Sequence, residues 1–154
     1  MEMSDLSEWE KRRQLLIEFQ KGLQLEFQVE DYNVFVFGSY IRPDFVAGES
    51  DIDMIVYCED KNRQGAIADF CREFFLAAGI ESDVLEYFYS VNAYIFANGI
   101  LNAFPMTGYY PEKLKNELYV IMRNFRYHIG DKKRKEKYYH WAYVYKNAAD
   151  RGDI

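Results

Sequence analysis

Two aspartates stand at the start of a hydrophobic segment. Asp51 and Asp53 alternate with apolar residues in SDIDMIVY, residues 50–57. In a β-strand, side chains alternate between faces, so the two carboxylates would share one face and Ile52 and Met54 the other. Two like charges this close repel each other unless a cation compensates them. The spacing therefore predicts a divalent cation, and oxygen ligands favour Mg²⁺ (or Mn²⁺) over zinc.

A Gly-Ser pair upstream supplies groups that suit phosphate. Gly38 ends the apolar run VFVF, residues 34–37, and Ser39 follows it. Glycine lets a phosphate approach the backbone amides, and the serine hydroxyl is a further donor. Arg42 adds a cation that can reach a triphosphate. Because Mg²⁺ usually completes its coordination with water and substrate phosphates, the combination predicts a phosphate-bearing substrate.

A third carboxylate is expected on the next strand. In ESDVLEYFYS, residues 81–90, the candidates are Asp83 and Glu86. Period-two geometry places them on opposite faces of a strand, so only one of them can join the aspartate pair. The residues themselves leave this choice open.

The quoted residues carry a family resemblance. FGSYIRPDFVAGESDIDMIVY resembles the signature of the DNA polymerase β-like nucleotidyltransferase superfamily, especially its small bacterial minimal nucleotidyltransferase branch. The match is close over residues 34–57, and the layout is similar to about residue 105. Two features depart from the family pattern: Pro43 follows Arg42 where glycine is usual, and the gap between Ser39 and Asp51 is at the long end of the family range.

The resemblance implies an enzyme that transfers a nucleoside monophosphate, AMP from ATP, to an acceptor hydroxyl and releases pyrophosphate. Asp51 and Asp53 would be catalytic and would bind Mg²⁺ (or Mn²⁺), together with a third acid. Asp83 fits the family's short strand with one embedded acid better than Glu86 does. The resemblance gives the phosphate-binding role to residues of the Gly-Ser motif and its loop, namely Gly38, Ser39 and Arg42.

Several readings of the function stay open. The acceptor is either a small-molecule hydroxyl or a protein tyrosine, and the main alternative is a non-catalytic nucleotide-binding or interaction module. Relatives of this kind act as antitoxins of HEPN-type ribonucleases, and in small nucleotidyltransferases a second protomer or partner often holds the acceptor. A toxin-like partner or a homodimer is therefore the expected protein partner. Arg123 and His128 resemble the R-x(4–6)-H motif of those ribonucleases, although an ordinary histidine at a helix end is the favoured interpretation.

Hydrophobic periodicity and turn residues predict an α+β fold. A small mixed β-sheet would be flanked by helices in a nucleotidyltransferase domain, residues 1–108, followed by a helical C-terminal extension, residues 109–154. Residues 23–29 also alternate as a strand would, but the longer helical stripe is favoured there. The loop 39–50 is expected to be neither helical nor extended, and Gly79 is expected to end its helix. The predicted helices cover residues 5–27, 62–78, 92–104, 112–128 and 132–149, and the predicted strands cover residues 34–37, 52–57 and 82–89.

Composition narrows the class of protein further. The chain has 154 residues and a net charge of −6, so nucleic-acid binding is not expected, and the basic run 132–137 is interpreted as a solvated helix start. Eight tyrosines between residues 109 and 145 are interpreted mainly as packing, with base stacking or a partner surface as alternatives. No apolar run is long enough for a membrane helix and no secretory signal is recognised, so a cytoplasmic protein with Cys58 and Cys71 reduced is expected.

Overall fold

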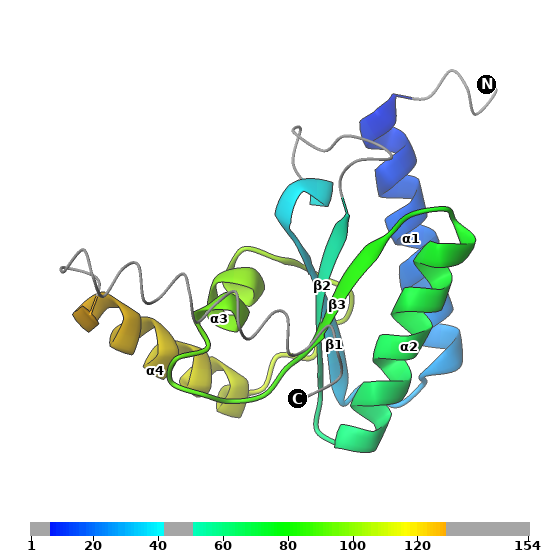
Figure 1. The fold of residues 1–154 in the computed structure, drawn as a ribbon. Helices are drawn as coiled ribbons and strands as arrows, with labels where there is room; N and C mark the ends of the chain where they lie inside the picture. Colours follow the sequence, from blue (N-terminus) through cyan, green and yellow to red (C-terminus); the bar gives the residue numbers. More distant parts are fainter. Residues whose placement is uncertain (1–6, 42–50, 129–154) are drawn as a thin grey trace.

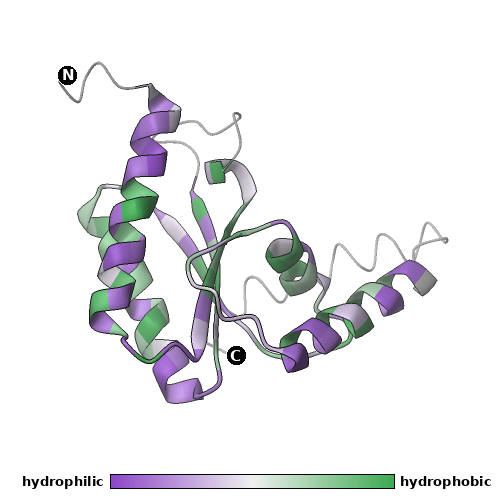
Figure 2. Ribbon diagram, turned by 180° about the vertical axis from the view of Figure 1, so that it is seen from behind, coloured by the Kyte–Doolittle hydropathy of each residue, from purple (hydrophilic) through white to green (hydrophobic). Residues whose placement is uncertain are grey.

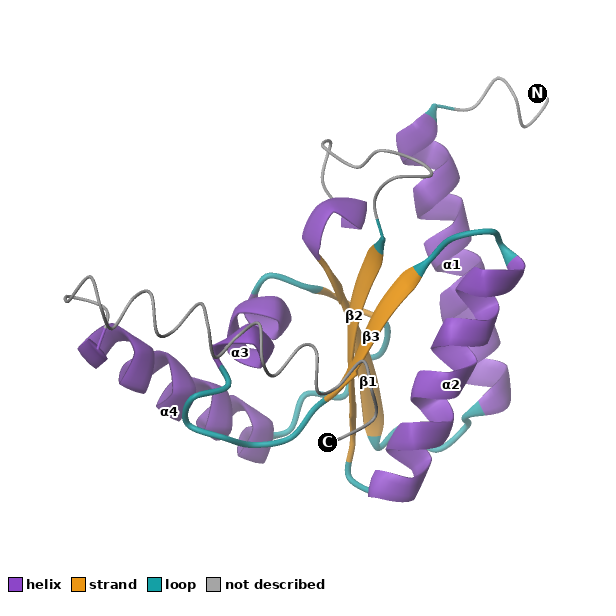
Figure 3. Cartoon of the chain, viewed as in Figure 1, coloured by secondary structure: helices purple, strands orange, loops and turns teal. Residues whose placement is uncertain are grey.

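A mixed four-stranded sheet forms the centre of the molecule in the computed structural model, which describes residues 7–41 and 51–128. Helices α1 and α2 cover one face of the sheet, and α3 and α4 cover part of the other (Figure 1 and Figure 3). The strand order is β3-β2-β1-β4, with β2 and β3 parallel and the other pairs antiparallel. The elements are α1 (Glu8–Glu26), β1 (Tyr32–Phe37), the 3₁₀ helix η2 (Gly38–Ile41), β2 (Ile52–Cys58), α2 (Lys61–Ala77), β3 (Ser82–Glu86), α3 (Tyr94–Leu101), β4 (Phe104–Pro105) and α4 (Glu112–His128).

The central strands β1 and β2 are apolar because helices cover them on both sides. Their sequences, YNVFVF and IDMIVYC, are almost entirely buried. Such continuous runs of β-branched and aromatic residues suit strands with no solvent-facing side. Figure 2 shows the same division: β1, β2 and α3 contain much green, whereas purple covers much of α1 and α4.

Capping residues fix the ends of α1 and α2. The Ser7 side chain accepts a hydrogen bond from the Glu10 amide at 3.1 Å, and Asp60 caps α2 in the same way. Phe19 of α1 meets Phe75 of α2 edge-on, with ring centroids 4.8 Å apart, in the core on this face. Gly79 follows α2 with φ +76°, which confirms the predicted helix end.

The second core lies on the opposite face of the sheet. Leu114, Leu118 and Ile121 of α4 are fully or almost fully buried there, together with residues of α3 and the sheet. The backbone of α3 rests directly on the sheet at Gly99, where a Cβ atom would lie 2.6 Å from Cδ1 of Ile55. Helix α4 therefore belongs to the same packed unit as α3.

The predicted mixed α+β architecture is confirmed, with differences at element ends. β3 stops at Glu86 instead of Tyr89, and the helix expected over residues 92–104 covers only Tyr94–Leu101. Residues 39–41 were expected to be loop and belong to η2. The rest of that loop, residues 42–50, and the predicted helix 132–149 lie outside the described residues.

The edge strand β4 was not predicted, and a buried asparagine explains it. Asn33 accepts hydrogen bonds at Oδ1 from the amides of Met106 and Thr107 and donates from Nδ2 to the carbonyl oxygens of Thr107 and Tyr109. This side chain holds the segment after α3 against β1. Among the described residues, no helix has both the length and the apolar character that crossing a bilayer requires.

Candidate active site

Asp53 and Asp83 are direct register partners on neighbouring strands. Asp53 of β2 pairs with Asp83 of β3 in the parallel ladder, one step after the pair Ile52 and Ser82. Parallel strands run about 4.8 Å apart, and register partners point to the same face. The structure therefore brings these two sequence-predicted carboxylates together on the face that carries α3 and α4.

Asp51, directly before β2, lies in line with this pair. We refer to Asp51, Asp53 and Asp83 as the acidic row. Asp51 immediately precedes the strand and is half-buried. Alternation along the chain places it on the same face as Asp53. Glu81 precedes β3 in the corresponding place, and its carbonyl accepts the Ile52 amide at 3.0 Å. Sequence reasoning did not consider Glu81 for the site, because only the strand register reveals that it lies level with Asp51.

Glu86 lies on the other face of the sheet. It pairs with Val56 at the opposite end of β3, and its Oε1 atom approaches α2, where it would lie 3.7 Å from a Cβ atom at Gly65. Residues three apart on a strand point to opposite sides. Of the two candidates for the third carboxylate, only Asp83 thus shares a face with Asp53.

Gly38, directly after β1, lies against Asp53 of the acidic row. Its φ is +77°, a conformation that favours glycine, and a Cβ atom built on it would lie 2.5 Å from Oδ2 of Asp53. The preceding residue, Phe37, is the register partner of Asp53 in β1. The glycine thus leaves room for the Asp53 carboxylate.

A buried tyrosine holds the turn that carries Gly38 and Ser39. Tyr40 is completely buried, and its hydroxyl donates to the carbonyl oxygen of Arg12 at 3.4 Å. The Arg12 guanidinium lies over the Tyr40 ring, 5.9 Å from its centroid. Burial raises the pKa of Tyr40 to about 12, although the nearby Arg12 charge opposes the shift. η2 is therefore fixed on the α1 side, while Gly38 faces Asp53.

The acidic row suits a hard divalent cation that a substrate helps to bind. In the described part of the chain, no group of three His, Cys, Asp or Glu side chains is close enough to enclose a metal by itself. Mg²⁺ commonly takes one or two protein carboxylates and fills its remaining positions with water and phosphate oxygens. Asp51 and Asp53, with the Gly38 backbone next to Asp53, could supply the protein part of such a site.

The structure describes the remaining predicted residues only in part. Arg42 lies outside the described residues, so its predicted role is untested. Arg123 lies on α4, and His128 is the last residue of that helix; the position of its side chain is not described. Cys58 and Cys71 are both buried and free.

Comparison with known families agrees with this fold. The nucleotidyltransferase domain family, part of the polymerase β-like superfamily, matches residues 6–103, which is more than half of the chain. The chain belongs to this family. The matched segment runs from α1 to α3 and contains the Gly-Ser turn and the acidic row. No curated protein and no solved structure matched the chain in the corresponding searches.

Proposed function

We propose that this nucleotidyltransferase transfers AMP from ATP to an acceptor hydroxyl and releases pyrophosphate. The observation that carries the proposal is the register pairing of Asp53 with Asp83 beside Gly38. Family membership supports transfer of a nucleotidyl group in general. The choice of ATP, of a two-metal mechanism and of the individual residues is our proposal.

The chain's own groups divide into a phosphate-binding set and a cation-binding set. The backbone amides around Gly38 and the Ser39 hydroxyl would donate hydrogen bonds to the β- and γ-phosphates, with Arg42 as an added cation. Asp51 and Asp53 would hold two Mg²⁺ (or Mn²⁺) ions, and Asp83 would bind the ion nearer the acceptor. When bound, such ions neutralise charge on the attacking and leaving oxygens of an in-line displacement.

The transfer itself exchanges one phosphoester bond for another. The acceptor oxygen forms a bond to the α-phosphorus, and the bond from that phosphorus to the bridging oxygen of pyrophosphate breaks. Pyrophosphate leaves with the electron pair of the broken bond. As the alternative to binding the ion nearer the acceptor, Asp83 would accept the acceptor's hydroxyl proton; its place on the same face as Asp53 supports either role.

The acceptor can be identified by following the transferred label. We would incubate the protein with ATP labelled at the α-phosphate, Mg²⁺ and a cell lysate, and then separate proteins, nucleic acids and small molecules. Label on a protein band would indicate a tyrosine-type acceptor, and label in the small-molecule fraction would indicate a small hydroxyl compound. GTP, CTP and UTP in parallel reactions would test the choice of base.

An aspartate variant provides the control for this assay. Asp53→Asn keeps the size of the side chain and removes its charge, so it should fold and transfer no label. Transfer that is absent from the wild type with every nucleotide, or equal in wild type and Asp53→Asn, would contradict the proposed catalysis. The first result would instead favour a nucleotide-binding or interaction module.

A further inference from the structure

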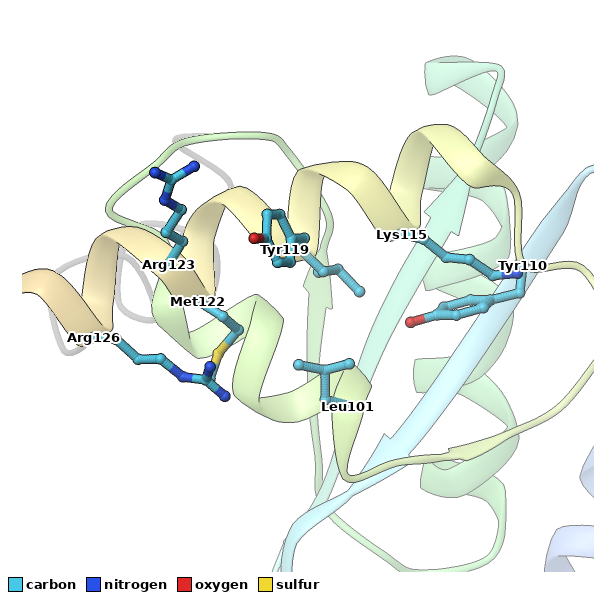
Figure 4. Close-up of a pocket in the computed structure, with 8 residues that line it drawn as sticks. Leu101, Tyr110, Lys115, Tyr119, Met122, Arg123 and Arg126 are labelled. Atoms are coloured by element: carbon cyan, nitrogen blue, oxygen red, sulfur yellow. The ribbon is translucent and has the colours of Figure 1, made fainter.

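A hollow beside α4 combines features that the proposed chemistry does not use. It has a volume of about 440 Å³, and apolar, aromatic and basic side chains line it, among them Tyr110, Tyr119, Met122, Arg123 and Arg126 (Figure 4). A volume of this size lies within the range of small-ligand sites. None of the acidic residues at the start of β2 and β3 lines it, so it is separate from the candidate active site.

Two arginines give the hollow its charge. Arg123 and Arg126 are both exposed, and neither forms an ion pair with any other residue in the described part of the chain. Figure 4 shows Arg126 beside Met122, while Arg123 leaves α4 in another direction. A guanidinium group binds phosphate through two parallel hydrogen bonds and stacks on aromatic rings. The pair can therefore contact an anion lying along this part of α4.

Two tyrosine rings also line the hollow. Tyr119 is 66% exposed although it stands in the middle of α4. Tyr110 lines the same hollow, and the Lys115 ammonium lies 5.3 Å from its ring centroid. An exposed ring such as Tyr119 can stack on a nucleobase, because every base has a flat π-face. The exposed Tyr119 ring is therefore available to stack on a base.

A second hollow of about 370 Å³ lengthens the surface. It shares Leu101 and Tyr110 with the first and continues to Asn33 and Phe35 of β1 and to Thr107 after β4. Phe35 and Asp53 belong to the same face of the sheet, since Phe35 pairs with Ile55. The surface is therefore an extended groove on the face that carries the acidic row.

The distribution of charge along the chain favours a polyanion. Residues 112–154 contain eleven Lys and Arg against six Asp and Glu, a net charge of +5, whereas residues 1–111 contain eight against nineteen, a net charge of −11. In the sequence, three residues separate the end of α4 from the basic run 132–137, which lies outside the described residues. The overall charge of −6 gave the expectation of no nucleic-acid binding, but that total hides this asymmetry.

We infer that the groove lined by Tyr110, Tyr119, Arg123 and Arg126 binds single-stranded nucleic acid. The arginines contact phosphates, and the tyrosines stack on bases. A single strand suits the site better than a duplex, because its bases are free to stack. This binding is independent of the proposed transfer reaction and needs neither a nucleotide donor nor a metal.

The test measures binding of a fluorescent twelve-nucleotide oligouridylate to the full chain by anisotropy, without NTP or divalent metal. We expect the double variant Arg123→Ala/Arg126→Ala to bind about tenfold more weakly. The slope of log affinity against log salt should fall by about 1.4, since two phosphate contacts are lost. Tyr119→Ala should weaken binding at least about fivefold with an unchanged slope. Thermal unfolding would show that the variants remain folded, as expected for exposed residues.

Matched variants distinguish binding in this groove from general electrostatic attraction. Arg13→Ala/Lys21→Ala removes the same charge from exposed positions of α1 and should bind as the wild type does. Asp53→Asn should also retain binding, even if the proposed catalysis fails. No oligonucleotide binding at low salt, or equal loss in both double variants, would overturn the inference. Tighter binding of a polyglutamate peptide, or equal binding of free UMP, would overturn it in favour of an acidic partner or a mononucleotide.

Discussion

The Asp53 carboxylate occupies the space that a side chain at Gly38 would need. A Cβ atom at Gly38 would lie 2.5 Å from Oδ2 of Asp53, whereas a Cβ atom at Gly79 meets no atom within 4 Å. Both glycines have positive φ, +77° and +76°. The chain thus contains a matched pair of glycines that differ only in their surroundings.

Alanine substitution at each glycine should separate backbone strain from the contact with Asp53. Gly38→Ala and Gly79→Ala should each lower the free energy of unfolding by about 1 to 2 kcal/mol, because both force alanine into the left-handed region. Only Gly38→Ala should also abolish transfer and weaken Mn²⁺ binding in the presence of nucleotide, because it displaces the carboxylate. Chemical denaturation and calorimetry would measure the two effects. Full activity in Gly38→Ala would contradict the proposed site.

Asp83 and Glu86 offer a second comparison on a single strand. Asp83→Asn should reduce transfer at least about a hundredfold, since the carboxylate facing Asp53 is lost. Glu86→Gln should leave transfer close to the wild-type rate, because Glu86 lies towards α2. Initial rates at saturating nucleotide would test this. The opposite ranking of the two variants would mean that Glu86 is the third acid.

Asn33 should contribute strongly to stability without touching the acidic row. Asn33→Ala would leave the amides of Met106 and Thr107 and the carbonyls of Thr107 and Tyr109 without this buried partner. We expect a loss of roughly 3 kcal/mol or more in the free energy of unfolding, or about 10 °C in Tm. Asn116→Ala, at an exposed position of α4, is the control and should change Tm by little. Similar Tm values for the two variants would show that Asn33 is not the main anchor of β4.

Buried tyrosines should make the protein sensitive to alkaline pH. Burial raises the pKa values of Tyr32 and Tyr40 from 10.0 to about 12. A group with a raised pKa in the folded state contributes stability fully below its unfolded pKa and loses it as pH rises through the folded pKa. The free energy of unfolding should therefore stay level to about pH 10 and decline towards pH 12.

A phenylalanine variant would test this origin of the alkaline decline. Tyr40→Phe keeps the ring and removes the ionisable hydroxyl, so the free energy of unfolding should fall less steeply between pH 10 and 12. Tyr119→Phe, at a position that is 66% exposed, should leave the slope unchanged. Denaturation curves at several pH values would supply the comparison. Equal slopes for Tyr40→Phe and the wild type would assign the decline to other groups.

The sequence predicted the central strands and the main helices because their patterns are strong. β1 and β2 are short apolar runs, and α2 and α4 have apolar residues at helical spacing with clear end signals. The end of β3 was predicted too late, because residues 87–89 continue a strand-like pattern in the sequence beyond the point where pairing with β2 stops. The last register pair joins Val56 to Glu86, two residues before β2 ends.

Features that depend on contacts between distant residues could not be predicted from local patterns. β4 contains only Phe104 and Pro105, and the hydrogen bonds of Asn33, more than seventy residues earlier, hold the segment that contains it. The alternation of Asp51 and Asp53, by contrast, could be recognised in the sequence. The pairing of Asp53 with Asp83 rests on a parallel register that a single strand does not reveal.

Side chains of β2 alternate between the two faces of the sheet, so the positions of the aspartates and of the core residues depend on each other. Ile52, Met54 and Val56 fill the core under α1 and α2, and the aspartates occupy the odd-numbered positions between and before them. Inserting or deleting one residue between Asp53 and Val56 would turn the aspartates towards the core under α1 and α2 and Ile52 towards the face that carries α3 and α4. Length changes in this strand would thus destroy folding and chemistry together, whereas substitutions can affect either one alone.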